Sequence, residues 1–194
     1  MSLTRAIDKF VFFCHEPGDR RYISPMSSKG SKNSAGDRNA GRESVWDYPR
    51  PPCVQRSSEH VEVWFAGQRI ADSTNAIRVL ETSHPPTYYI PASDVAMDHL
   101  AVSTHRSVCE FKGKARYYDI AVRNHTVRNA VWDYPNPRAG YEILENHLCF
   151  YPGKMDRCLV DGEEVQRQEG EFYGGWITSR ITGPFKGGPG TRGW

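Results

Sequence analysis

Short apolar stretches separated by glycine, proline and asparagine turns fill most of the chain beyond residue 44. Residues 61–65 alternate between apolar and polar side chains and are rich in β-formers, and a turn at Ala66-Gly67-Gln68 predicts a hairpin with residues 69–72. Asp161-Gly162 predicts a second hairpin. Many short strands with Gly/Pro turns and little helix predict a mainly β fold.

Further strands are expected where β-branched and aromatic residues cluster between turn residues. They cover residues 87–90, 108–112, 115–122, 126–132, 148–151 and 172–178. Lys112 falls in the tight Phe-Lys-Gly turn between two of them. The last expected strand contains Gly174-Gly175, which predicts a bulge or a close backbone contact.

One or two short helices are also expected. In residues 72–82, polar residues that favour helix caps precede apolar side chains at helical spacing, and Pro85-Pro86 ends the segment. Residues 94–100 are expected to form one helical turn with Ser93 as its cap.

The N-terminal part of the chain differs from the rest. Residues 26–43 contain one large apolar residue, Met26, and therefore cannot bury enough surface to offset the entropy of ordering. We expect residues 1–43 to be a disordered or loosely docked extension, and residues 44–194 to form one β domain. Whether residues 1–25 belong to the native protein stays open.

An aromatic motif occurs twice. Residues 45–52 read VWDYPRPP and residues 131–138 read VWDYPNPR. The prolines prevent helix and favour extended geometry before them. We expect two aromatic strand ends that pack on the same body, which is a partial internal repeat.

Composition excludes several classes of protein. The formal charge of +2 is scattered without a basic stripe, which argues against nucleic-acid binding. No apolar run approaches the ~20 residues of a membrane span. Five cysteines without a C-x-x-C argue against a disulfide framework and a zinc site, and the histidines lack metal-ligand spacing. The prediction is a cytoplasmic protein without metal or cofactor and of unknown oligomeric state.

The order of motifs resembles domain-of-unknown-function family 427, a bacterial and fungal group also labelled nucleotidyltransferase-like. The resemblance covers about residues 60–152, and the motifs that carry it are IADS (70–73), A-x-R-V-L-E-T (76–82), PPTYYIP (85–91), the spaced Cys109, Lys112, Gly113, Ala115 and Tyr117, and Ala130-x-Trp132-x-Tyr134-Pro135.

The resemblance implies a β-tent fold of coiled antiparallel sheets, with a C-terminal strap at residues 158–194 that looks like the extended, cyanobacterial-type version. The nucleotidyltransferase label normally accompanies a Gly-Ser stretch followed by metal-binding aspartates. That pattern is absent from this sequence, so the activity is not carried over.

The candidate site combines residues from two segments. If residues 72–82 are helical, Arg78 and Glu81 share a face. Tyr88 and Tyr89 point to opposite faces of a strand, so only one of them can join that face. Lys112 is expected to complete the site. A simpler alternative is a surface pair of Arg78 and Glu81 with a snorkelling Lys112.

Cys109 is the one cysteine within the family pattern, and an inert buried thiol is the simpler alternative to a nucleophile. Tyr117, Trp132 and Tyr134 could line a pocket or belong to an ordinary β core. The leading hypothesis is therefore a domain that binds a small polar or aromatic ligand in a pocket near Glu81, Tyr88 and Lys112. The alternatives are an enzyme that uses Glu81 and Lys112 as acid and base or Cys109 covalently, and an adaptor that binds a protein through the WDYP motifs.

Overall fold

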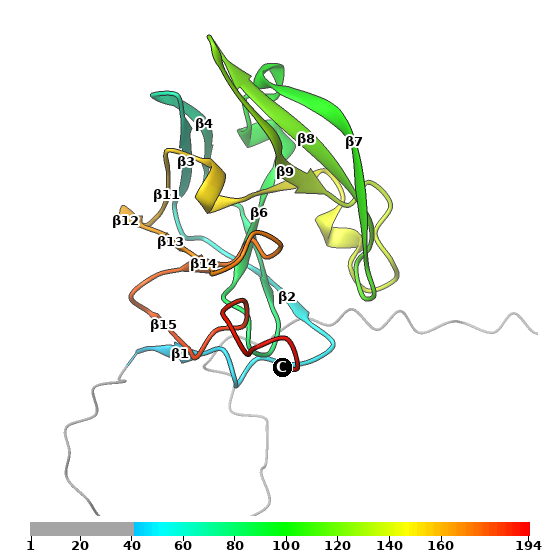
Figure 1. The fold of residues 1–194 in the computed structure, drawn as a ribbon, viewed down its shortest axis with the longest axis vertical. Helices are drawn as coiled ribbons and strands as arrows, with labels where there is room; N and C mark the ends of the chain where they lie inside the picture. The colour runs from blue at the N-terminus through cyan, green and yellow to red at the C-terminus, as the bar shows by residue number, and fades with distance from the viewer. Residues whose placement is uncertain (1–40) are drawn as a thin grey trace, which may run out of the picture.

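A seven-stranded antiparallel sheet dominates the computed structural model, which describes residues 41–194 (Figure 1). Its strands in spatial order are β2 (Cys53–Arg56), β5 (Ile77–Leu80), β6 (Thr87–Pro91), β10 (His147–Phe150), β9 (His125–Asp133), β8 (Gly113–Val122) and β7 (Leu100–Cys109). Register shifts interrupt the β7–β8 and β8–β9 pairings, which adds local twist to these long strands.

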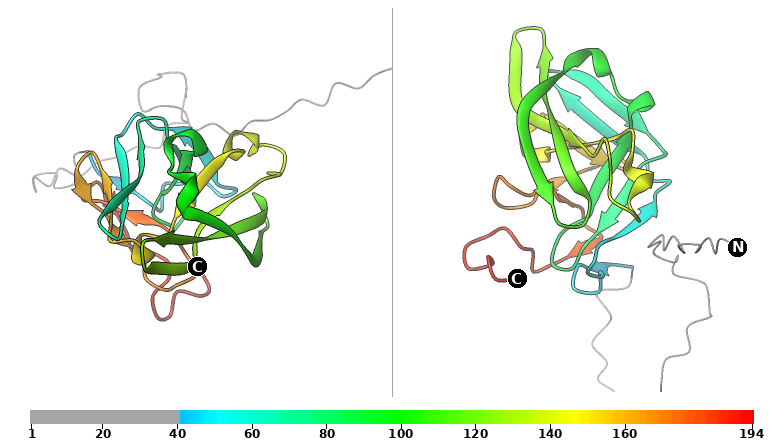
Figure 2. Two further views of the ribbon diagram at one scale, coloured as in Figure 1. Left: turned by 90° about the horizontal axis from the view of Figure 1, so that it is seen from above. Right: turned by 90° about the vertical axis from the view of Figure 1, so that its right-hand side faces the viewer.

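A four-stranded sheet lies on the opposite side of the molecule from the long strands β7 and β8 (Figure 2). Its order is β12 (Glu163–Glu164), β11 (Arg157–Val160), β3 (Val61–Phe65) and β4 (Gln68–Ser73). Both predicted hairpins are confirmed. Gly162 follows Asp161 with φ +81°, and Asp161 itself has φ 49°, so this two-residue loop matches the twist of its strands.

The remaining elements are short. The two-residue strands β1 (Glu43–Ser44) and β15 (Ile181–Thr182) pair with each other, which joins the start of the described chain to its C-terminal segment. Within that segment, β13 (Gln166–Arg167) pairs with β14 (Trp176–Ile177). Four 3-10 turns connect strands: η1 (Ala92–Asp94), η2 (Met97–His99), η3 (Glu142–Leu144) and η4 (Pro152–Lys154).

The central strands are buried on both faces, so their side chains alternate between two hydrophobic clusters. In β6, Tyr88 and Ile90 belong to a first cluster that includes residues of the four-stranded sheet, whereas Tyr89 belongs to a second cluster. In β9, Val131 belongs to the first cluster and Trp132 to the second. The second cluster supports the candidate site.

The mainly β prediction is confirmed, but the helix expected at residues 72–82 is wrong. Residues 77–80 form β5, which is hydrogen-bonded to β2 on one side and β6 on the other, with all four residues buried. Pairing with two neighbouring strands therefore outweighs the local helical spacing. The turns at 92–99 are two separate 3-10 turns, and no side chain caps the first of them.

Two other boundaries differ from prediction. Of the last expected strand, 172–178, only Trp176–Ile177 form a strand, β14, because the residues before them form a loop around Gly174-Gly175. Conversely, β7 begins at Leu100, eight residues before the expected strand at 108–112. Most of the expected N-terminal extension lies outside the described residues, and Glu43 at its end belongs to β1.

Candidate functional site

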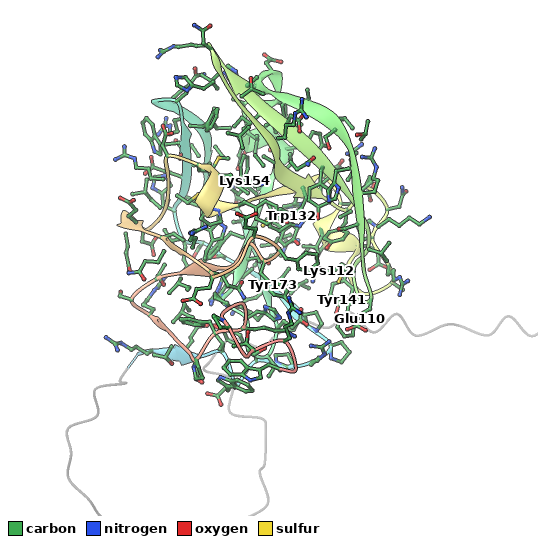
Figure 3. All side chains as sticks on the ribbon, viewed as in Figure 1. Glu110, Lys112, Trp132, Tyr141, Lys154 and Tyr173 are labelled. Atoms are coloured by element: carbon green, nitrogen blue, oxygen red, sulfur yellow. The ribbon has the colours of Figure 1, made fainter. Side chains whose placement is uncertain are left out.

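A cavity of about 370 Å³ opens against the second hydrophobic cluster. Its walls come from β5 and β6, from the β7–β8 hairpin with its turn, from β9, and from the C-terminal segment between Gln168 and Lys186. Figure 3 places Trp132, Lys112 and Tyr173 around this region. The volume is typical of sites that hold small molecules.

Aromatic side chains form the floor. Trp132 donates its indole N–H to the Tyr89 hydroxyl oxygen at 3.1 Å, and its ring lies 4.4 Å from the ring of Tyr151. The Tyr134 ring lies 6.2 Å from that of Tyr89. Burial raises the pKa of Tyr89, so its hydroxyl stays protonated. The floor is therefore apolar, neutral and held by its own contacts.

Charged side chains lie beside this floor. Lys112 and Glu81 have side chains only 10% and 18% exposed, and Lys112 Nζ lies 4.0 Å from Glu81 Oε2. Arg50 contributes from a third segment: its guanidinium lies 3.3 Å from Glu81 and 2.7 Å from Glu110. Two partly desolvated opposite charges thus face an aromatic cavity.

The thiol of Cys109 also lines the cavity. Its Sγ accepts a hydrogen bond from the backbone N–H of Lys112 at 3.5 Å, across the turn that joins β7 to β8. Cys109 is half-buried, whereas the free thiols of Cys149 and Cys158 are fully buried. Burial raises the pKa of both buried thiols.

The C-terminal segment closes one wall of the cavity. Gly174 lies so close to Trp132 that a Cβ would come within 2.3 Å of the indole ring, which explains why glycine stands there. The predicted close backbone contact at Gly174-Gly175 is therefore confirmed. Next to it, the Tyr173 ring lies 4.7 Å from the ring of His84.

Gln168 connects this wall to His84. The backbone N–H of Gly175 donates to Gln168 Oε1 at 3.1 Å. Gln168 Nε2 lies 2.6 Å from the Lys186 carbonyl oxygen and 3.1 Å from His84 Nδ1. Burial, together with the nearby charges of Lys186, Lys112 and Arg50, lowers the pKa of His84 to about 4. His84 is therefore neutral at physiological pH.

Most of the residues predicted for the site line this one cavity: Glu81, Tyr89, Cys109, Lys112, Tyr117, Trp132 and Tyr134. Of the two neighbouring tyrosines, Tyr88 and Tyr89, Tyr89 is the one that lines the cavity. The hydroxyl oxygen of Tyr117 lies 2.8 Å from Ser107 Oγ at the cavity wall. Their chemical roles stay predictions.

Arg78 and Tyr88 lie on the opposite face of the sheet, so their placement with Glu81 is wrong. Residues 78 and 88 are cross-strand partners, and both point away from the face that carries Val79 and Tyr89. Arg78 donates to Glu43 at 2.6 Å, and Tyr88 donates to Glu59 at 2.7 Å. The error follows from the helix predicted in place of β5, because three-residue spacing gives one face on a helix and two faces on a strand.

The sequence prediction missed His84, which lies within the first expected segment between Glu81 and Tyr88. It also missed residues from outside both segments, namely Arg50, Gln168, Phe172, Tyr173 and Lys186. The close contact expected at Gly174-Gly175 was the one signal in the sequence that could have shown that the C-terminal segment lines the cavity.

Within residues 41–194, no group of three or more His, Cys, Asp or Glu side chains could hold a metal ion. No helix in the same range is long and apolar enough to cross a membrane.

The family described as a domain of unknown function, DUF427, matches residues 53–161, which is more than half of the 194-residue chain. The match confirms the resemblance and extends it beyond residues 60–152 at both ends. No curated protein matches the chain.

Proposed function

The chain belongs to the DUF427 family, and we propose that its cavity binds a small polar or aromatic molecule. The observation that carries this proposal is the pair of shielded charges, Glu81 and Lys112, which face an aromatic-lined cavity. Removing charges from water is costly unless they are well paired. At 4.0 Å the Lys112 ammonium lies beyond hydrogen-bond distance of Glu81, so it keeps donors for a ligand.

A thermal-shift screen against nucleotides, sugars, amines and aromatic acids tests the proposal. A bound compound is expected to raise Tm, by an amount that grows with its concentration over Kd. Lys112→Met should abolish the shift. Lys114→Met is the matched control, because Lys114 is exposed on the same hairpin and does not line the cavity. No shift by any compound would contradict the proposal.

A second candidate function is covalent chemistry at Cys109. The thiol lies on the cavity wall, where it accepts the Lys112 N–H, and reactive cysteines lie in partly exposed, electropositive surroundings. Titration of the native protein with iodoacetamide should modify Cys109 faster than an ordinary exposed thiol. Cys149 and Cys158 serve as internal controls because both are buried. A rate for Cys109 no greater than that of a free thiol would contradict this candidate.

The adaptor alternative receives less support from the fold. The Trp46 ring of the first WDYP motif packs edge-to-face against the Trp194 ring, with centroids 5.4 Å apart, and its indole N–H donates to the Pro184 carbonyl oxygen at 3.0 Å. The first WDYP motif thus packs against the C-terminal segment of its own chain. We also propose a cytoplasmic location and the extended, cyanobacterial-type subtype. Support for the subtype comes from residues 162–194, which follow the matched family region and pack against it.

A further inference from the structure

We infer that the ligand of this cavity is a small planar aromatic anion, whose charged group lies between Lys112 and His84 while its ring lies on the Trp132–Tyr151 floor. This inference rests on the proposed function and adds the chemical class of the ligand. Four features of the cavity support it: the distribution of partners among its charges, the hydrogen bonds of His84, the charges around His84 and the shape of the floor.

The charged groups of the cavity differ in how well they are paired. Three cations, Arg50, Lys112 and Lys186, and two carboxylates, Glu81 and Glu110, line it. Arg50 lies within ion-pair distance of both carboxylates. Lys186 donates to the carbonyl oxygen of Trp194.

Lys112 is the least engaged of the three cations, since within residues 41–194 its ammonium has no hydrogen bond and one ion pair, the 4.0 Å contact with Glu81. All three of its N–H donors therefore stay free, whereas Lys186 has used one of its own on Trp194. A buried ammonium with free donors calls for an anionic acceptor on the ligand.

The hydrogen bonds of Gln168 fix the tautomer of His84. Because Gly175 N–H donates to Gln168 Oε1, the amide nitrogen must face the Lys186 carbonyl oxygen and His84 Nδ1. Nδ1 therefore accepts a hydrogen bond, and a neutral His84 carries its proton on Nε2. The ring lines the cavity, so His84 offers an N–H donor there without a charge.

The surroundings of His84 also favour an anion. After burial, the charges of Lys186, Lys112 and Arg50 are what disfavour protonation of the imidazole. A positive potential that keeps a proton off His84 attracts a carboxylate to the same place. The repulsion from Glu81 is offset because Arg50 holds that carboxylate at 3.3 Å.

The floor selects the rest of the ligand. The Trp132 and Tyr151 rings lie 4.4 Å apart at an interplanar angle of 46°. Phe172 and Tyr173, whose rings lie 5.1 Å apart, also line the cavity. A flat aromatic ring can contact several of these aromatic faces at once. Gln168, Phe172 and Tyr173 follow the matched family region, which ends at residue 161, so this chain's own extension shapes the selectivity.

A matched series of probes tests the inference by isothermal titration calorimetry on the full chain at pH 7. Indole-3-acetate, indole-3-acetamide and tryptamine share one ring and differ in charge, and benzoate, benzamide and benzylamine repeat the comparison with a smaller ring. At least one acid is expected to bind at least about tenfold more tightly than the amide with the same ring, and the amine is expected to bind most weakly. Lys112→Met should remove the advantage of the acid, whereas Lys114→Met should preserve it.

The outcomes separate the two proposals. If an amide or an amine binds as tightly as its acid, the anion inference is overturned while the cavity remains a ligand site. If acetate binds as tightly as the aromatic acids, the aromatic part of the inference is overturned. If no probe of any charge binds and the wider screen also gives no shift, the proposed function fails with it.

His84 has an independent readout. Long-range ¹⁵N–¹H NMR spectra of the wild type at pH 6 should show a neutral His84 with its proton on Nε2. Gln168→Glu places an acceptor opposite Nδ1, so it should move the proton to Nδ1 and raise the pKa of His84. A wild-type His84 that titrates near pH 6.5 would overturn its assignment as a neutral donor.

Discussion

The two VWDYP motifs, residues 45–49 and 131–135, share five residues and have different environments. In both copies the valine is fully buried. Trp46 of the first copy is 44% exposed, whereas Trp132 of the second is 6% exposed. The aspartates follow the same division, because Asp47 is exposed and Asp133 is buried.

Neighbouring strands produce this difference. The second copy begins within β9 and supplies the last three residues of that strand. There, Trp132 pairs with Tyr117 of β8 on one side and with Cys149 of β10 on the other. The first copy follows the two-residue strand β1 and forms a turn. The expected strand end is therefore confirmed for the second copy and wrong for the first. A shared motif fixes which residues can pack, and the elements beside it decide whether they do.

The largest expected effect separates the tryptophans. Trp132→Ala should lower the free energy of unfolding by about 3–5 kcal/mol, because it empties the floor of the cavity and removes the indole from the Tyr89 hydroxyl. Trp46→Ala should cost about 1 kcal/mol, since it mainly removes the edge-to-face contact with Trp194. Urea unfolding of both variants measures the difference. Equal losses would show that the copies are equivalent in energy.

The aspartates should repeat this order at smaller magnitude. Asp133 accepts hydrogen bonds from Arg116 and, at 3.0 Å, from the Tyr118 hydroxyl. Asp133→Asn weakens these bonds and should cost about 1.5–3 kcal/mol in the same unfolding assay. Asp47→Asn is the matched control and should stay within about 0.5 kcal/mol of wild type. A cost for Asp47 comparable to that for Asp133 would refute the assignment.

Local patterns predicted the strands and their turns well. Alternation at Val61–Phe65 and the Asp161-Gly162 turn reflect preferences that act within a few residues, and both hairpins formed as expected. The segment at Ile77–Leu80 failed because its spacing fits a helix, while its actual state depends on β2 and β6. Partners distant in sequence are invisible to a local pattern.

The same limit applies to the cavity. Glu81 and Lys112 were predicted as partners, and Cys109 was singled out as the one cysteine within the family pattern; all three line one cavity. Arg78 was placed with them through a helical face that does not exist. His84 and Gln168 were missed because their contact joins residues 84 positions apart, and only the folded chain brings them together.

The first copy depends on polar contacts, so acid should weaken it selectively. Burial acts to raise the pKa of Glu43. The hydrogen bond and the charge of Arg78 oppose burial, and Tyr48 donates a second hydrogen bond. Together they outweigh burial, so the pKa of Glu43 is lowered from 4.5. Its stabilisation is therefore present above about pH 4.5 and is lost as pH falls through the lowered value.

Glu43→Gln should flatten the acid limb of a plot of unfolding free energy against pH. The exposed Asp47 supplies the control, and Asp47→Asn should leave the limb unchanged. An unaltered slope in Glu43→Gln would show that the link from Glu43 to Arg78 and Tyr48 contributes no pH-dependent stability.

The smallest effect concerns the arginines that follow the two copies, because both hold the turn that carries Lys112. Arg50 contacts the Glu110 carboxylate at 2.7 Å, and Arg138 donates to the Glu110 carbonyl oxygen at 2.5 Å. Either arginine changed to Met should cost only about 0.5–1 kcal/mol of stability, as is usual for an exposed ion pair such as that of Arg50 and for an exposed hydrogen bond such as that of Arg138.

Ligand binding should nevertheless distinguish these two variants. Arg50 also holds Glu81 at 3.3 Å, so Arg50→Met leaves that carboxylate to repel an anion or to bind Lys112. The affinity for the tightest aromatic acid should fall about threefold to tenfold, which corresponds to about 0.7–1.4 kcal/mol. Arg138→Met removes no contact with a charged side chain of the cavity, so its affinity for the acid should stay within about twofold of that of the wild type. Equal losses of affinity would mean that both arginines act only by supporting the turn, and that Glu81 does not oppose the ligand.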